Sequence, residues 1–180
     1  MKLTKDIKDI FKDNGSFQQG DSSPRPEAKI YCDGASSGNP GHAGIGVVIQ
    51  FKKNHRDSAT QAGQDSEPDS IDLPGSREDC CISEYIGITT NNVAEYSALV
   101  RGLREASSLG LKRIEIFLDS ELLVKQIKGI YKIKSAKLSP LWAEAQKILK
   151  LFDSYKITHI QRKLNKKADN LAKKAAKGLI

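Results

Sequence analysis

Four acidic residues occupy positions where an ordinary surface charge is least expected. Asp33 and Asp119 each end an apolar stretch that is typical of a buried strand. Glu95 and Asp169 fall in the first turn of predicted helices. Taken singly, each has a structural explanation: a turn former at Asp33, an N-cap at Asp119, and acids that favour the helix dipole at the other two. Crowded together at one edge of a mixed sheet, four carboxylates would raise one another's pKa values unless cations held them.

Carboxylate clusters of this kind point to metal chemistry. Oxygen ligands select hard divalent ions, so Mg²⁺ is the expected ion and Mn²⁺ the expected substitute. Two such ions, about 4 Å apart, are a known arrangement for cutting phosphodiester bonds. The joint pattern of the four acids therefore indicates metal-assisted phosphodiester hydrolysis, with the separate structural explanations as the alternative.

The elements that must position these acids follow from hydrophobic periodicity. Strands are predicted at residues 29–33, 44–51 and 85–89, with a turn-forming loop at 34–41. A helix at 92–109, a strand at 113–118 and a helix at 121–130 follow. Ser139 as N-cap, with Pro140 behind it, opens a helix to about residue 152; the last elements are a strand at 156–162 and a helix at 166–177. This order predicts an α/β fold with a mixed sheet and helices on its faces.

Two segments fall outside this pattern. Residues 1–27 are an N-terminal extension: apolar residues at helical spacing in 1–12 predict a short amphipathic helix, and a polar tether follows. Residues 52–84 are acidic and carry Pro68 and Pro74, which predicts a mobile surface insertion within a hairpin. The folded domain is thus expected to span residues 28–180.

Composition excludes several classes of protein. A chain of 180 residues with 38% hydrophobic residues fits one domain with a full core. Its apolar stretches are far shorter than the roughly 18 residues of a membrane span. The charged start of the chain lacks the apolar core of a secretory signal, so a cytoplasmic location is expected. Three cysteines, Cys32, Cys80 and Cys81, are expected to be reduced thiols.

The net charge of +7 is concentrated in the last third of the chain. Residues 121–180 hold fifteen basic and four acidic residues. Such a basic segment favours a polyanionic partner, and nucleic acid is the leading one, because lysines set against phosphates release counterions. A solvated lysine face that only keeps the protein soluble is the alternative.

Four sequence blocks, in the same order as in the family, closely resemble the ribonuclease H type 1 family. They are YCDGASSGNPG at 31–41, TTNNVAE at 89–95, LDS at 118–120 and NKKADNLA at 165–172. The resemblance covers about residues 28–177. It implies the ribonuclease H-like α/β fold, a five-stranded mixed sheet of order 3-2-1-4-5 with helices on both faces. It also implies endonucleolytic cleavage of the RNA strand of RNA–DNA hybrids, leaving 5′-phosphate and 3′-hydroxyl ends.

The resemblance assigns roles to individual residues. The four acids become catalytic metal ligands for two Mg²⁺ ions that bind together with substrate: Asp33 bridging them, Asp169 on the ion that activates water, and Glu95 and Asp119 on the ion beside the leaving 3′-oxygen. Groups that read the 2′-hydroxyl, the bases or the DNA phosphate, or that otherwise contact the hybrid, are expected at Gly34, Ala35, Ser36, Asn39, Thr90, Asn91, Asn92, Arg162 and Asn165. The expected partner is an RNA–DNA hybrid bound by a monomer, with an unidentified protein partner for residues 1–27.

Two departures from the family pattern are visible. Residues 130–137 are too short for the long basic helix-loop that grips the hybrid in many members, so lysines at 132, 134, 137, 163, 166 and 167 are candidates for that grip. The link 161–165 carries no histidine before the last acid; Arg162 is a candidate for its electrostatic part, and His159 is expected to pack.

Two other functions stay open at this point. One is a catalytically silent module that binds hybrids or double-stranded RNA with the same fold; intact carboxylates argue against it, since they would repel phosphates without metal. The other is a metal nuclease with different strand choice, such as a DNA resolvase. The Asn91-Asn92 pair, tied to sugar reading in the resembled family, disfavours the resolvase.

Overall fold

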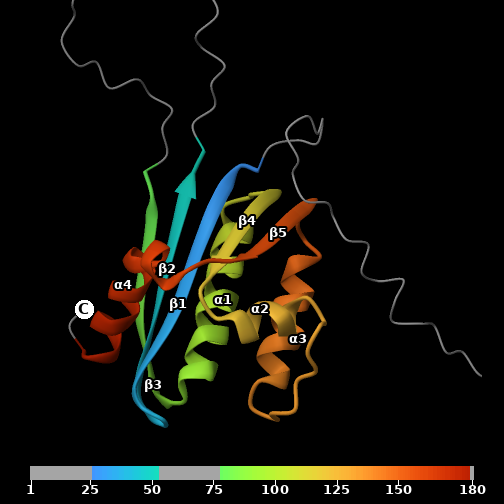
Figure 1. Cartoon of the computed structure of the whole chain (residues 1–180). Coiled ribbons are helices and arrows are strands. Elements are labelled where there is room, and N and C mark those ends of the chain that lie inside the picture. The colour runs from blue at the N-terminus through green and yellow to red at the C-terminus, as the bar shows by residue number, and fades with distance from the viewer. Residues whose placement is uncertain (1–25, 53–77, 179–180) are drawn as a thin grey trace, which may run out of the picture.

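The computed structural model describes residues 26–52 and 78–178. They form five strands, four α-helices and a short 3₁₀ helix around one sheet (Figure 1). In chain order the elements are β1 (Ala28–Gly38), β2 (Gly41–Phe51), β3 (Cys80–Thr89), α1 (Asn91–Ser108), β4 (Arg113–Leu118), α2 (Glu121–Ile127), α3 (Ser139–Leu149), β5 (Ser154–His159), η2 (Arg162–Leu164) and α4 (Lys166–Ala176).

The sheet confirms the predicted topology. Its strand order is β3-β2-β1-β4-β5, with β1, β2 and β3 in an antiparallel meander and β4 and β5 parallel to β1. In the parallel pair of β1 and β4, Cys32 lies opposite Leu118. The residues that follow them, Asp33 and Asp119, therefore come to the same edge of the structure.

Different helices cover the two faces of the sheet. α1 and α3 pack against one another behind the sheet, and α4 lies on the opposite face across β1, β2 and β3 (Figure 1). Alternate residues of β1, such as Ile30 and Cys32, meet Leu99 and Leu103 of α1 in a core where each is at most 1% exposed. Asp33, the residue after Cys32, therefore points to the face that carries α4.

Two glycines bring helix backbones directly onto the sheet. A Cβ atom at Gly34 would lie 2.2 Å from the backbone nitrogen of Glu95 in α1. A Cβ atom at Gly46 would lie 2.1 Å from the carbonyl oxygen of Ala168 in α4. Because Gly46 lies opposite Asp33 in the β1–β2 ladder, these approaches set both helices beside that acid.

The helix starts correct two predictions. Ser120 caps α2 by accepting a hydrogen bond from the Leu123 amide at 3.4 Å, so Asp119 is free of the capping role that would explain it structurally. Leu138, not Ser139, is the N-cap of α3 and makes no side-chain capping bond. Pro140 still lies in the first turn, as predicted.

Several predicted boundaries are wrong. The loop expected at 34–41 is mostly strand, since β1 runs to Gly38, β2 begins at Gly41, and the turn is Asn39–Pro40 with a cis peptide bond. β3 begins at Cys80, so residues 80–84 belong to the sheet and not to the insertion. α2 ends at Ile127 and β5 at His159, both earlier than predicted.

The structures expected for the N-terminal extension and for the insertion remain predictions. Residues 1–25 and 53–77, which hold the predicted amphipathic helix and most of the predicted insertion, lie outside the described residues. Within the described part of the chain, none of the helices has the length and apolar character needed to cross a bilayer.

Candidate active site

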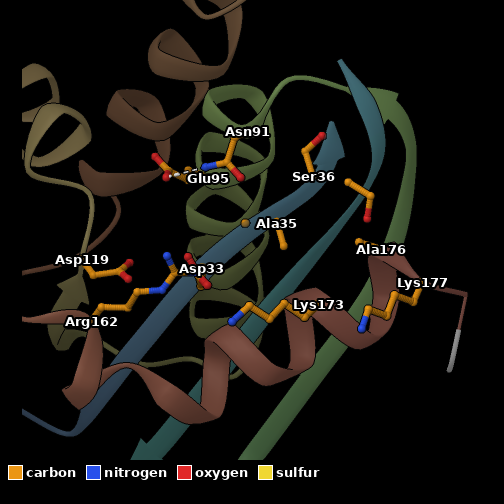
Figure 2. A pocket seen from close by; sticks show the side chains of 12 residues that line it. Asp33, Ala35, Ser36, Asn91, Glu95, Asp119, Arg162, Lys173, Ala176 and Lys177 are labelled. Carbon is orange, nitrogen blue, oxygen red and sulfur yellow. Dashed lines mark hydrogen bonds between the residues drawn. The ribbon is translucent and has the colours of Figure 1, made fainter. Parts of the chain in front are cut away.

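A cleft of about 330 Å³ opens where β1, α1, β4, η2 and α4 meet. Asp33, Asp119 and Arg162 gather at one end, and Ser36, Ala176 and Lys177 lie toward the other (Figure 2). The lining residues are Asp33, Gly34, Ala35, Ser36, Ser37, Asn91, Glu95, Asp119, Arg162, Lys173, Ala176 and Lys177.

Asp33 is the buried centre of this cleft. It lies within β1 and not at its end as predicted, it is 6% exposed, and its Oδ2 atom has no hydrogen-bond partner. Burial, followed by the charges of Asp119, Asp169 and Glu95, raises the pKa of Asp33 to about 8. The four predicted acids therefore act on one another electrostatically, as their joint pattern required.

Glu95 reaches the cleft from the second turn of α1, one turn later than predicted. Its Oε1 atom accepts a hydrogen bond of 2.9 Å from the Asn91 side chain, one helical turn earlier. Burial raises the pKa of Glu95, and hydrogen bonds from Ser120 and Asn91 oppose that shift. Asn91 thus orients this carboxylate.

Asn165 positions Asp119 instead of facing the cleft. Its side chain is 1% exposed, and its Nδ2 atom donates to the carbonyl of Cys32 at 2.9 Å and to Oδ1 of Asp119 at 3.2 Å. It therefore ties the middle of β1 to the acid that follows β4. This burial does not support the prediction that Asn165 contacts substrate, because the residue is 1% exposed and does not line the cleft.

Asp169 is held by two cations. Its Oδ1 atom accepts from Nη2 and Nε of Arg162, at 2.6 and 3.1 Å, and its Oδ2 atom accepts from Nζ of Lys173 at 2.5 Å. Burial acts to raise the pKa of Asp169, but the bonds from Lys173 and Arg162 outweigh it, so the pKa lies below its ordinary value.

The predicted substrate-reading residues are divided between the cleft and its surroundings. Gly34, Ala35, Ser36, Asn91 and Arg162 line the cleft. Three others do not: Thr90 caps α1, Asn39 accepts a hydrogen bond of 3.4 Å from the Asn91 amide, and Asn92 is exposed on the first turn of α1.

Ser36 contributes its hydroxyl to the scaffold. The hydroxyl lies 2.5 Å from the carbonyl oxygen of Gly38 and 2.9 Å from that of Thr89, so its one proton is shared between the end of β1 and the end of β3. Its backbone remains on the cleft wall, where the resemblance places a reader of the sugar.

Sequence reasoning missed two lysines of the cleft. Lys173 and Lys177 follow Asp169 at intervals of four residues on α4, so they share its face of the helix. That spacing was the available signal. The lysine at 167, predicted to grip hybrid, instead pairs with Asp79 at 3.2 Å. His159 is exposed and bonds the Asp119 carbonyl at 3.2 Å, so the prediction that it packs is wrong.

The donor set fits a hard divalent cation. Asp33, Glu95 and Asp119 line the cleft, and Asp169 lies close enough for its charge to act on Asp33. One buried oxygen of Asp33 lacks any hydrogen bond, which leaves it available to a metal ion. As the side chains stand, no three Asp, Glu, His or Cys residues in 26–52 and 78–178 are placed so that they could hold one ion. Metal binding therefore requires the carboxylates to move toward the ion. For Asp169, the two cationic partners explain why its carboxylate is not already placed as a ligand.

Comparison with known proteins places this geometry in a family. A family model described as reverse transcriptase-like matches residues 74–175. Ribonuclease HI of Halobacterium salinarum is 35% identical over 145 residues, which are 81% of this chain and 62% of that protein. This chain thus spans less than two thirds of the length of that curated relative.

Two solved structures match this chain over nearly their whole length. The crystal structure of RNase H1 from Halobacterium salinarum is 32% identical, with a TM-score of 0.67, over 84% of this chain and 98% of that one. LC11-RNase H1, solved in complex with an RNA/DNA hybrid, is 33% identical, with a TM-score of 0.63, over 84% and 97%. The matched family model, the strand order and these two structures lead to one conclusion: the chain belongs to the reverse transcriptase-like, ribonuclease H type 1 family.

Proposed function

We propose that this protein is an endoribonuclease that cuts the RNA strand of RNA–DNA hybrids by two-metal-ion hydrolysis, leaving 5′-phosphate and 3′-hydroxyl ends. The observation that carries the proposal is the position of Asp33 in the cleft. One of its buried oxygens has no hydrogen-bond partner, and the negative charges of Glu95, Asp119 and Asp169 raise its pKa. An RNA/DNA hybrid in the solved structure of LC11-RNase H1, 33% identical, supports the substrate.

The chain's own residues have separate tasks in this proposal. Asp33, Glu95, Asp119 and Asp169 would hold two Mg²⁺ ions, for which Mn²⁺ is able to substitute. Bound ions of this kind lower the pKa of the attacking water and stabilise charge on the leaving oxygen. Asn91 orients Glu95, and Asn165 orients Asp119, so each carboxylate is fixed by a neutral donor before an ion arrives.

Substrate choice is assigned to the polar wall of the cleft. The backbone of Gly34, Ala35 and Ser36 and the amide of Asn91 present both donors and acceptors within short reach. A hybrid differs from duplex DNA by the 2′-hydroxyls of one strand, which such groups are able to bind. Contacts to sugar and backbone carry little base information, so weak sequence preference is expected.

The first prediction tests this function with one labelled RNA strand, offered as hybrid, as duplex RNA and as single strand. We expect cutting of the hybrid alone, in Mg²⁺ or Mn²⁺ and not in chelator. Asp33→Asn should abolish it by removing the carboxylate shared by the site. Asp153→Asn, on an exposed residue between α3 and β5, is the matched control and should cut at the wild-type rate.

Each of the other possible results would favour a different function. Binding of hybrid without cutting would favour the catalytically silent module. Cutting of duplex DNA at a similar rate would favour a nuclease with different strand choice. We also propose that the chain acts as a monomer in the cytoplasm, which sedimentation and cell fractionation would test.

A further inference from the structure

The four acids at the cleft have two different kinds of partner. Glu95 and Asp119 accept hydrogen bonds from the uncharged amides of Asn91 and Asn165, and one oxygen of Asp33 accepts none. In contrast, both oxygens of Asp169 are taken by cationic side chains. One part of the cleft is thus open to a metal ion, whereas the part at Asp169 already holds positive charge.

The two cations at Asp169 are not equivalent. Arg162 makes two hydrogen bonds to a single oxygen through a planar guanidinium, which fixes its orientation. Lys173 makes one contact, through a compact ammonium on a flexible four-carbon stem. Both side chains reach solvent, at 68% exposed for Arg162 and 50% for Lys173, so the difference between them lies in the number of bonds to Asp169. An arriving ion therefore displaces Lys173 more readily than Arg162.

Lys173 lies where a displaced ammonium has room. It comes one helical turn after Asp169 on α4, lines the cleft, and extends toward Asp33 and Arg162 (Figure 2). The next lysine, Lys174, is exposed and does not line the cleft. Lys173 and Lys174 thus carry the same charge and are neighbours on the same helix, but only Lys173 lines the cleft.

We propose that Lys173 is a built-in counter-ion that holds the place of the second metal ion at Asp169. Metal ions then bind in order: the first among Asp33, Glu95 and Asp119, and the second only when the Lys173 ammonium leaves the Asp169 carboxylate. This inference rests on the proposed function and adds to it an order of metal binding set by one residue. Without Lys173, the charge of Asp169 would add to the repulsion within the metal-free cleft.

The test is a Mn²⁺ titration of the full-length protein without nucleic acid. Calorimetry measures the heat of binding, and electron paramagnetic resonance measures the concentration of free Mn²⁺. Lys173→Met keeps an unbranched side chain and removes the competing charge. We expect it to tighten the weaker binding event about tenfold, the effect of removing one charge at contact distance from a partly exposed ligand. Lys174→Met, with the same change in net charge, should alter that event less than twofold. If the wild type shows one event only, a second should emerge in Lys173→Met.

Two results would overturn the proposal. Equal tightening in both variants would mean that net charge alone is responsible, and weaker binding in Lys173→Met would mean that Lys173 supports the metal site. If Lys173→Met does not fold, the nitrogen-15 signal of the wild-type Lys173 ammonium gives the answer. That signal should change as Mg²⁺ fills the second site, and an unchanged signal at saturation would contradict displacement.

The failure of this inference is separable from the failure of the proposed function. Wild-type protein that binds no Mn²⁺, or an Asp33→Asn variant that titrates like the wild type, would remove the metal site itself. Wild-type binding that Asp33→Asn weakens, together with Lys173 and Lys174 variants that behave alike, would leave the metal site in place and reject only the role of Lys173.

Discussion

At the scale of single residues, Asp33 makes the metal-free protein sensitive to pH. Its pKa rises from an ordinary 3.8 to about 8 in the folded protein, so between these values the folded state binds a proton that the unfolded state has lost. Stability in chelator should therefore fall as pH rises from about 4 to about 8, by at most about 1.4 kcal/mol per pH unit.

Thermal melts in chelator across this pH range would measure the effect. Asp33→Asn carries no titrating group and should flatten the profile and melt higher than wild type at pH 8. Mn²⁺ should bind more tightly as pH rises toward 8, since the ion needs the ionised carboxylate. A wild-type melting temperature that rises steadily over the range would contradict the assignment.

Asn165 offers a second prediction at this scale, because it separates positioning from substrate contact. Asn165→Leu removes the buried bonds to Cys32 and Asp119, so the free energy of unfolding should fall by about 1–3 kcal/mol. Urea unfolding in chelator would measure the loss, and Mn²⁺ affinity should fall with it. Unchanged unfolding together with weaker hybrid binding would restore the role in substrate contact.

The residues of the site were predictable to different degrees. The four acids stand out in the sequence because Asp33 and Asp119 each end an apolar stretch, and Glu95 and Asp169 each fall near the start of a predicted helix. The burial of Asn165 could not be predicted, since an asparagine before a helix is ordinarily an exposed cap, and only the packing of α4 against β1 encloses it. The contact of Lys173 with the cleft was not predicted, because a lysine-rich helix face is usually solvated.

At the scale of elements, the close approach of α4 to β2 determines where Asp169 lies. Gly46→Ala places a Cβ atom against the Ala168 carbonyl, so α4 must shift. We expect a loss of about 1–3 kcal/mol in stability, as for an overpacked core. Hybrid cleavage should fall further than folding alone explains, because Asp169 moves with the helix.

A matched variant separates packing from backbone effects. Gly87→Ala in β3 meets no atom within 4 Å and carries only the strain of a φ of +86°. It should cost about 1 kcal/mol and leave the rate of the folded fraction unchanged. Chemical unfolding and single-turnover cleavage at equal folded fractions would measure both variants. Equal rates in Gly46→Ala and wild type would mean that α4 does not fix the site.

The order of the elements was predictable from periodicity, but some boundaries were not. Residues 34–38 are small and polar, a composition typical of loops, yet they continue β1 because β2 pairs with them residue by residue. Pairing across a sheet is a tertiary property that composition does not report. The two-residue turn at Asn39–Pro40 is the one part of that segment with the predicted conformation.

At the scale of the whole molecule, the charge distribution predicts a modest electrostatic grip on the hybrid. Among residues 26–52 and 78–178, only Lys173, Lys177 and Arg162 bring positive charge to the cleft, and the first and last of these also pair with Asp169. Eleven residues, 128–138, separate α2 from α3, and no helix forms within them. Few phosphate contacts follow, each contributing about −0.9 to the slope of log affinity against log salt.

Hybrid binding in chelator, measured by fluorescence anisotropy from low to physiological salt, would give that slope. We expect a shallow one. A slope steeper than about −8 would mean that the exposed lysines outside the cleft contribute many more contacts than the structure assigns.

The four acids come from β1, α1, the residue after β4, and α4, and 136 positions separate the first from the last. A fragment must therefore contain both β1 and α4 to hold the whole set. A protease that removes α4 leaves a sheet with three acids, and one that removes β1 leaves a fragment without Asp33. Partial digestion products that have lost either element should cut no hybrid, so that cleavage reports only copies of the domain that are intact from β1 to α4.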